Sequence, residues 1–212
     1  MMIESLSLAI LVSAIIAVIF RQLENVNMYA VFKPLTTILI ILLAVIIYKK
    51  FPSTYSTIMI VSLMFSLMGD IFLINKKYFL QGLSSFLLAH IGFTIGFASL
   101  FGFSWSIMPI AVLSIIGGSY FNFLRQDLHK YTIPVVIYMA AIIIMNWQAI
   151  SLVFHGYAIV YIGIAVASLL FTFSDSIIAY NKFKKPFNIA EILILTTYWI
   201  AIYIFTIAGL YI

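Results

Sequence analysis

The chain has 212 residues, of which 65% are hydrophobic and only 8% are charged, and its mean hydropathy is +1.21. Soluble domains are about half apolar and about a quarter charged, so this composition excludes a soluble enzyme and predicts an integral membrane protein. The absence of cysteine excludes disulfides, thiolate metal sites and cysteine nucleophiles. The net charge of +5 does not indicate a nucleic-acid partner. The basic residues flank the apolar stretches, where they orient the protein in the membrane and contact anionic lipids.

The chain is long enough for eight membrane spans, because one transmembrane helix needs about 20 apolar residues. Its long apolar runs lack the period-two alternation of membrane strands and favour helices. We predict an all-α polytopic membrane protein, a bundle of about eight transmembrane helices in a single domain over residues 1–212, with seven spans as the alternative. The first helix is expected to be a retained span, because no basic segment precedes it. The expected helices are Ser5–Phe20, Pro34–Tyr48, Thr54–Ile74, Tyr78–Phe101, Ile107–Leu124, Tyr131–Trp147, Tyr157–Tyr180 and Phe187–Tyr211.

Basic residues are concentrated in the loops at one end of the expected bundle. Two of them, Lys49 and Lys50, fall at the other end. Because cytoplasmic loops carry an excess of lysine and arginine, we predict that the more basic end is cytoplasmic and that both termini lie outside, in a bacterial inner membrane. The nine basic residues at that end are Arg21, Lys33, Lys76, Lys77, Arg125, Lys130, Lys182, Lys184 and Lys185.

The two halves of the chain share a weak pattern. Each places a proline at the start of its second helix, Pro34 and Pro134, and an aspartate late in its third, Asp70 and Asp175. This pattern is consistent with two parallel four-helix repeats, in which the third and seventh helices would be equivalent and could face each other.

The two aspartates interrupt apolar spans and are the strongest functional signal in the sequence. Asp70 lies in FSLMGDIFLINKK and Asp175 in FTFSDSIIAYNKF, each shortly before the basic end of its helix. An acid inside a span costs at least roughly 2.5–3.5 kcal/mol on insertion, so it is a functional candidate by default. Two buried carboxyls can serve as acid and base at neutral pH. The alternative is structural: each aspartate fastens its helix to a neighbour or pairs with a base such as Lys33.

Four further polar residues are candidates for substrate contact. Lys33 precedes the second helix, where it could hold a phosphate or anchor the span at the interface. His90, midway along the fourth helix, could contact a ligand or transfer a proton, or be a neutral histidine bonded to a neighbour. Glu191 could cap the eighth helix, and Tyr198 lies two turns further along the same face.

These features leave several classes of function open. A small membrane transporter or lipid flippase also uses acids within spans, although it needs access to both faces, and these polar groups gather near one. A structural membrane protein is another alternative. The sequence has no serine-hydrolase elbow, phosphate loop or dinucleotide motif. His90 and the two aspartates lack the spacing of zinc ligands, so no metal or cofactor is predicted.

Several of these segments together resemble the YhhN-type lysoplasmalogenase family. The resemblance rests on KPL at Lys33–Leu35, LMGD ending at Asp70, FLQGLSSFLLAH ending at His90, FSDSIIAYNKF around Asp175 and TTYW ending at Trp199. It implies hydrolysis of the vinyl-ether bond of a lysoplasmalogen, with lysophospholipid substrate and membrane lipids as the partners. The reaction needs one carboxyl to deliver a proton and another to steady the cation or activate water, as in glycoside hydrolysis. On this reading Asp70 and Asp175 form the acid/base pair, Lys33 binds phosphate, and His90, Glu191 and Tyr198 shape the pocket or relay protons.

Overall fold

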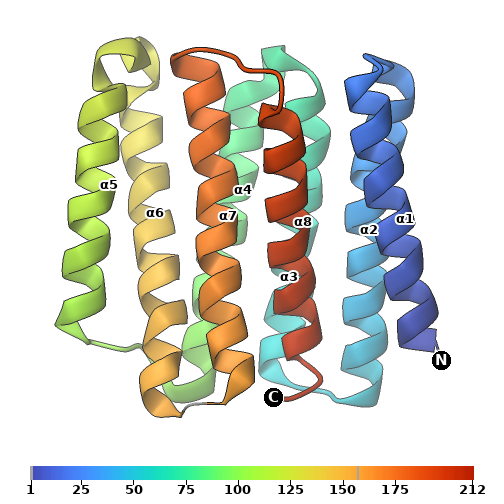
Figure 1. Ribbon diagram of the computed structural model, residues 1–212. Helices are drawn as coiled ribbons and strands as arrows, with labels where there is room; N and C mark the ends of the chain where they lie inside the picture. The colour runs from blue at the N-terminus through green and yellow to red at the C-terminus, as the bar shows by residue number, and fades with distance from the viewer. Residues whose placement is uncertain (1, 157) are drawn as a thin grey trace.

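The computed structural model describes residues 2–156 and 158–212, and these residues form eight α-helices and no strand. The helices stand side by side and alternate in direction (Figure 1). The predicted all-α bundle of about eight helices is confirmed. The helices are α1 Met2–Gln22, α2 Val26–Lys50, α3 Thr54–Ile74, α4 Phe79–Phe101, α5 Ile107–Leu128, α6 Thr132–Ser151, α7 Ile159–Phe183 and α8 Ala190–Ala208.

Seven helical segments in the described ranges are long and apolar enough to cross a membrane. The longest of them, Ile107–His155, contains two helices, α5 and α6, joined through a 3₁₀ turn at His129–Tyr131. When that segment is counted as two helices, the number of crossings is even. Both termini therefore lie at the same end of the bundle, as Figure 1 shows. The predicted placement of both termini on one side follows this alternation, while the side of the membrane that they face stays a prediction.

The helix boundaries differ most from the prediction at α2. This helix begins at Val26 and contains Pro34 in its interior, whereas the sequence favoured a start at Pro34. The side chain of Asn25 accepts a hydrogen bond from the backbone N–H of Met28 at 3.1 Å and so caps the earlier start. Membrane helices tolerate an internal proline that would stop a helix in a soluble protein. The predicted start of the seventh helix, Tyr157, lies outside the described residues.

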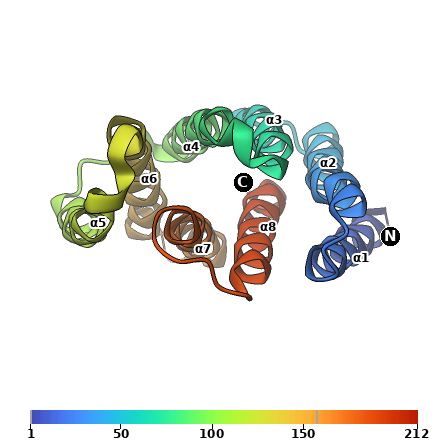
Figure 2. The same cartoon turned by 90° about the horizontal axis from the view of Figure 1, so that it is seen from above.

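Seen from above, the bundle is elongated, with α2, α3 and α4 along one side and α1, α8 and α7 along the other (Figure 2). Helices α5 and α6 lie together at one end of this arrangement. The closest approach within it is between α3 and α4, because a Cβ added at Gly92 would lie 2.3 Å from Ser62 Oγ and one at Gly96 would lie 2.2 Å from Met59 Cε. Small residues at helix interfaces permit such an approach, so Gly92 and Gly96 are packing contacts between α3 and α4.

Helices α3 and α7, which carry the two aspartates, are not adjacent. Helix α8 packs against both of them, and within the described ranges the backbones of α3 and α7 make no contact with each other. The relation between the two halves of the chain as parallel repeats stays a prediction. The arrangement gives each aspartate a separate set of neighbours.

Candidate active site

Asp70 lies at the centre of a polar cluster between α2, α3 and α8. Its carboxyl group is 1% exposed and accepts hydrogen bonds at Oδ2 from Thr37 Oγ1 at 2.6 Å and from the Tyr198 hydroxyl at 2.8 Å. The other oxygen, Oδ1, lies 3.7 Å from Nζ of Lys33, which is also buried. The two donors and the ammonium favour the charged form of this carboxyl, whereas its burial opposes that form. Trp199 Nε1 supports the cluster by donating to Thr37 Oγ1 at 3.3 Å.

A line of polar side chains connects Asp70 with the basic end of the bundle. The ammonium of Lys33 lies over the ring of Tyr29, 5.8 Å from its centroid. The Tyr29 hydroxyl donates to Glu191 Oε2 at 3.5 Å, and Glu191 Oε1 accepts from Arg21 Nη2 at 3.0 Å. Arg21 and Glu191 are only partly buried, so this line runs from the end of α1 and the start of α8 into the bundle.

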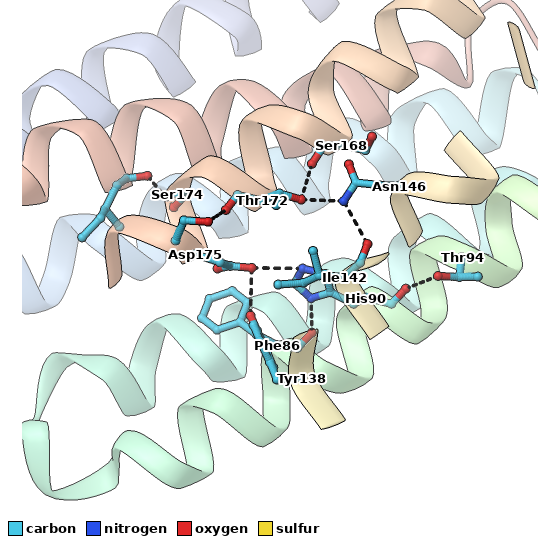
Figure 3. Close-up of polar contacts among 12 residues, drawn as sticks. Phe86, His90, Thr94, Tyr138, Ile142, Asn146, Ser168, Thr172, Ser174 and Asp175 are labelled. Atoms are coloured by element: carbon cyan, nitrogen blue, oxygen red, sulfur yellow. Dashed lines mark hydrogen bonds and ion pairs between the residues drawn. The ribbon is translucent and has the colours of Figure 1, made fainter. Parts of the chain in front are cut away.

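Asp175 belongs to a second cluster, formed by α4, α6 and α7 (Figure 3). Its Oδ2 accepts a hydrogen bond from the Tyr138 hydroxyl at 3.0 Å and lies 3.1 Å from Nε2 of His90. On the other side of the imidazole, Nδ1 lies 2.6 Å from the carbonyl oxygen of Phe86. All three side chains are buried. Asp175, which is 7% exposed, is more exposed than Asp70, which is 1% exposed.

These contacts determine where the protons of the second cluster can lie. The Phe86 carbonyl can only accept, so Nδ1 of His90 carries a hydrogen, and the neutral form of the ring then has a lone pair at Nε2. That lone pair would face a carboxylate oxygen at 3.1 Å, which is repulsive unless a proton lies between them. Nε2 of His90 and Oδ2 of Asp175 thus lie within ion-pair distance, while Nε2 makes no hydrogen bond within the described part of the chain.

Asp175 lines an apolar cavity of about 230 Å³ between α4, α5, α6 and α7. The walls of this cavity are largely aliphatic and aromatic. Its polar lining residues are Tyr120, Tyr138, Asn146, Thr172, Asp175 and Ser176. Such a cavity, apolar with a few converging polar groups, is the usual form of a small-molecule site. Asp70 does not contribute to its lining.

Two phenylalanines, Phe86 and Phe171, form an aromatic wall between the clusters. Phe86 lines the cavity and packs edge-on against Tyr198, with ring centroids 5.6 Å apart. Phe171 contacts Tyr198 at 5.2 Å and His90 at 4.7 Å between centroids. Gly69 makes room for this packing, because a Cβ there would lie 2.5 Å from the Phe86 ring. The described residues provide no direct hydrogen bond or ion pair between the two clusters.

The structure brings together most of the predicted site residues, though in two groups. Lys33 and Tyr198 contact Asp70, His90 contacts Asp175, and Glu191 joins the first group through Tyr29. Both acids lie toward the basic end, Asp70 four residues before the end of α3 and Asp175 eight before the end of α7. At 1.5 Å per residue, these depths are about 6 Å and about 12 Å, so Asp175 is the deeper acid.

Sequence reasoning missed four residues of these clusters: Thr37, Tyr138, Asn146 and Trp199. Asn146 carried a usable signal, since an amide within an apolar span is as unusual as an acid there. Thr37 and Tyr138 carried none, because threonine and tyrosine are ordinary residues in membrane helices. The described residues contain no group of three histidine, aspartate or glutamate side chains arranged to hold a metal ion.

Comparison with known proteins gives the family context of this site. A sequence model of the YhhN family matches residues 28–209. The chain is 33% identical over 153 residues to lysoplasmalogenase TMEM86A of Bos taurus, covering 69% of this chain and 62% of the relative. It is 30% identical over 159 residues to lysoplasmalogenase TMEM86B of Homo sapiens, covering 74% and 65%. The chain thus spans less than two thirds of the length of these relatives. No solved structure matches it.

Proposed function

Because this chain belongs to the YhhN family, we propose that it is a membrane-embedded hydrolase that cleaves the vinyl-ether bond of lysoplasmalogens. The products are a fatty aldehyde and a glycerophospho-ethanolamine or -choline. The observation that carries the proposal is the buried carboxyl of Asp175 at the wall of an apolar cavity, with its Oδ2 3.1 Å from Nε2 of His90. The curated relatives named as lysoplasmalogenases give it independent support.

The proposed reaction begins with transfer of a proton to the outer carbon of the vinyl ether. The carbon–carbon double bond supplies the electron pair for the new C–H bond, and the inner carbon and ether oxygen share the resulting positive charge. Water then adds to the inner carbon and loses a proton. The hemiacetal collapses by breaking the bond between that carbon and the glycerol oxygen, which takes up a proton and leaves as the alcohol.

Asp175 is the proposed acid, because it lines the cavity, whereas Asp70 does not. The Tyr138 hydroxyl donates to the same carboxyl oxygen and orients it. After proton transfer Asp175 is a carboxylate, and the proton that the attacking water loses returns to it, while His90 orients the carboxyl from 3.1 Å away. The aliphatic part of the cavity accepts the first segment of the alkenyl chain, and the rest of the chain extends toward the lipid.

Asp70 is the proposed second carboxyl. Its negative charge would stabilise the oxocarbenium ion through the aromatic wall, because charges interact strongly across a water-free interior. Tyr198 positions Asp70 against that wall, and the ammonium of Lys33, 3.7 Å from Asp70 Oδ1, favours the negative charge there, in place of the phosphate contact expected from the sequence. Glu191 and Arg21, at the membrane surface end of the polar line, are the proposed contacts for the headgroup.

The proposal is tested by aldehyde release from an alkenyl lysophospholipid, using the purified protein in detergent. The wild type is expected to release aldehyde, and Asp175→Asn is expected to lose at least 100-fold in kcat, because an amide cannot protonate carbon and general acid catalysis contributes about 10²–10⁴-fold. Tyr180→Phe, on the same helix and outside the cavity lining, is the control for folding and detergent handling. A folded wild type without aldehyde release, or Asp175→Asn with full activity, would refute the proposal.

A further inference from the structure

In the side-chain amide of Asn146 on α6, the nitrogen is hydrogen-bonded and the oxygen has no hydrogen-bond partner among the described residues. Nδ2 donates to the carbonyl oxygen of Ile142 at 2.9 Å and to Thr172 Oγ1 at 2.6 Å. Oδ1 has no hydrogen-bond partner in the described part of the chain, although Asn146 is only 1% exposed. The Ile142 carbonyl can only accept, so the nitrogen must face it and the free atom is the oxygen. A buried acceptor without a donor is costly, and the site therefore favours a ligand that supplies one.

The residue that bears this oxygen lines the cavity of the proposed active site. Asn146 and Thr172 line it together with Asp175 and Tyr138, and Figure 3 shows Asn146 beside Thr172 on the α7 side. Thr172 precedes Asp175 by three residues on α7, which places them on the same face, about 4.5 Å apart along the helix axis. A substrate at Asp175 thus has the Asn146 acceptor about one turn deeper in the bundle.

The chemistry of the acceptor selects the group that it binds. A neutral amide oxygen in an apolar cavity favours an uncharged donor, since burying an ammonium there would cost far more than one hydrogen bond returns. Acids and esters offer no donor at neutral pH. The remaining common donor on a lipid is a hydroxyl. In a lysoplasmalogen the hydroxyl on the second glycerol carbon lies five bonds from the carbon that is protonated, a span that one helical turn can match.

We infer that Asn146 is a specificity-determining residue whose Oδ1 accepts a hydrogen bond from the free hydroxyl on the second glycerol carbon of the substrate. The inference rests on the proposed function, since it assumes that the vinyl ether lies at Asp175. It explains selection between lipids: an acyl group on that hydroxyl removes the donor, leaves Oδ1 unpaired and adds bulk. Sites built to bind a hydroxyl strongly reject the analogue that lacks it.

The test compares two non-hydrolysable 1-O-alkyl lysophospholipids, one with the hydroxyl on the second glycerol carbon and one with hydrogen in its place. Their binding to the detergent-solubilised protein is measured by calorimetry. The wild type is expected to bind the hydroxyl lipid about tenfold more tightly, the value of one buried hydrogen bond. In Asn146→Leu this ratio is expected to fall to about one. Met139→Leu, which lines the same cavity two turns away and conserves volume, is expected to keep the ratio.

Equal binding of the two lipids by the wild type would overturn the inference without recourse to any variant, and would leave a bound water as the partner of Oδ1. Retention of the tenfold ratio in Asn146→Leu would also overturn it, as would a wild type that binds neither lipid.

Aldehyde release from the matching alkenyl lipids separates the two proposals. Hydroxyl-selective binding without aldehyde would support the role of Asn146 and refute the hydrolase. Equal kcat/KM for the two alkenyl lipids would refute the role of Asn146 and leave the hydrolase standing.

Discussion

Asp70 and Asp175 are both buried carboxyl groups, yet their polar neighbours differ. Asp70 faces an ammonium and two hydroxyl donors, which together favour the carboxylate. Asp175 accepts a hydrogen bond from the Tyr138 hydroxyl and lies 3.1 Å from Nε2 of His90, with no ammonium beside it. Two carboxyls in different environments are the usual basis for separate acid and charge-stabilising roles. This difference supports our proposal that Asp175 is the acid, a choice that the sequence left open.

The contact between Lys33 and Asp70 predicts a specific pattern of stability. Asp70→Asn leaves a buried ammonium without its partner and is expected to lower the free energy of unfolding by about 3–5 kcal/mol. Lys33→Met combined with Asp70→Asn removes both charges and is expected to recover most of that loss. Denaturant unfolding in detergent measures both. A double variant no more stable than Asp70→Asn would contradict the ion pair.

At this scale, sequence reasoning identified residues whose type is rare in a span. Asp70, Asp175, His90 and Lys33 stand out in an apolar chain, and the structure places each of them in a polar contact. It did not identify Tyr138, because a tyrosine in an apolar helix is unremarkable until the neighbouring helix is known. The separation of the acids into two clusters also depends on which helices touch, and local spacing carries no such information.

The α3–α4 pair fixes the positions of both clusters at the level of secondary structure. Asp70 is on α3 and His90 is on α4, and the two helices approach closely where Gly92 meets Ser62. Ser62 and Ser66 donate hydrogen bonds to carbonyl oxygens one turn earlier in their own helix. Their hydroxyls are therefore satisfied within α3, and these small side chains let α4 pack closely against it. Any side chain that separates α3 from α4 should therefore disturb both acids.

Gly92→Ala is expected to destabilise the protein by about 1–3 kcal/mol, because the new Cβ would lie 2.3 Å from Ser62 Oγ. Gly118→Ala on α5 is the matched control, since a Cβ there has no neighbour within 4 Å. That control is expected to be neutral or slightly stabilising, because alanine favours helix more than glycine does. Thermal unfolding of the two variants in the same detergent decides the matter, and equal melting temperatures would contradict the packing described for α3 and α4.

The helices themselves followed from the sequence, and their ends followed less well. The third and fourth were expected at Thr54–Ile74 and Tyr78–Phe101, and α3 and α4 occupy Thr54–Ile74 and Phe79–Phe101. Helix α2 was missed in its first two turns, because proline usually marks a helix start and here lies inside the helix. The capping side chain of Asn25 decides that boundary.

The distribution of basic residues between the two ends of the bundle and the cavity beside Asp175 are properties of the whole molecule. The basic loops lie at the end of the bundle that is nearer to both aspartates. Because successive helices run in opposite directions, an even number of helices places both termini at the other end. The cavity, in contrast, depends on how α5 and α6 stand against α4 and α7, a matter of tertiary packing. No periodicity or composition in the sequence could have predicted it.

The charge bias predicts the orientation of the bundle in a bacterial membrane. An alkaline phosphatase fusion at Ile212 is expected to be active, because the C-terminus should face outside, and a fluorescent-protein fusion there is expected to be dark. Fusions after Lys185, at the basic end, are expected to give the reverse result. Fluorescence from the fusion at Ile212 would contradict the predicted orientation.

The measurement that tests the account most directly is mass spectrometry of both products after turnover of an alkenyl lysophospholipid in ¹⁸O-labelled water. Protonation of the vinyl ether by Asp175 sends water to the carbon that becomes the aldehyde, so the glycerophospho product should keep its original oxygen and contain no ¹⁸O. Label in the glycerol hydroxyl would mean that water attacked the glycerol carbon instead. That result, or the absence of both products from folded protein, would contradict carboxyl-catalysed cleavage of the vinyl ether.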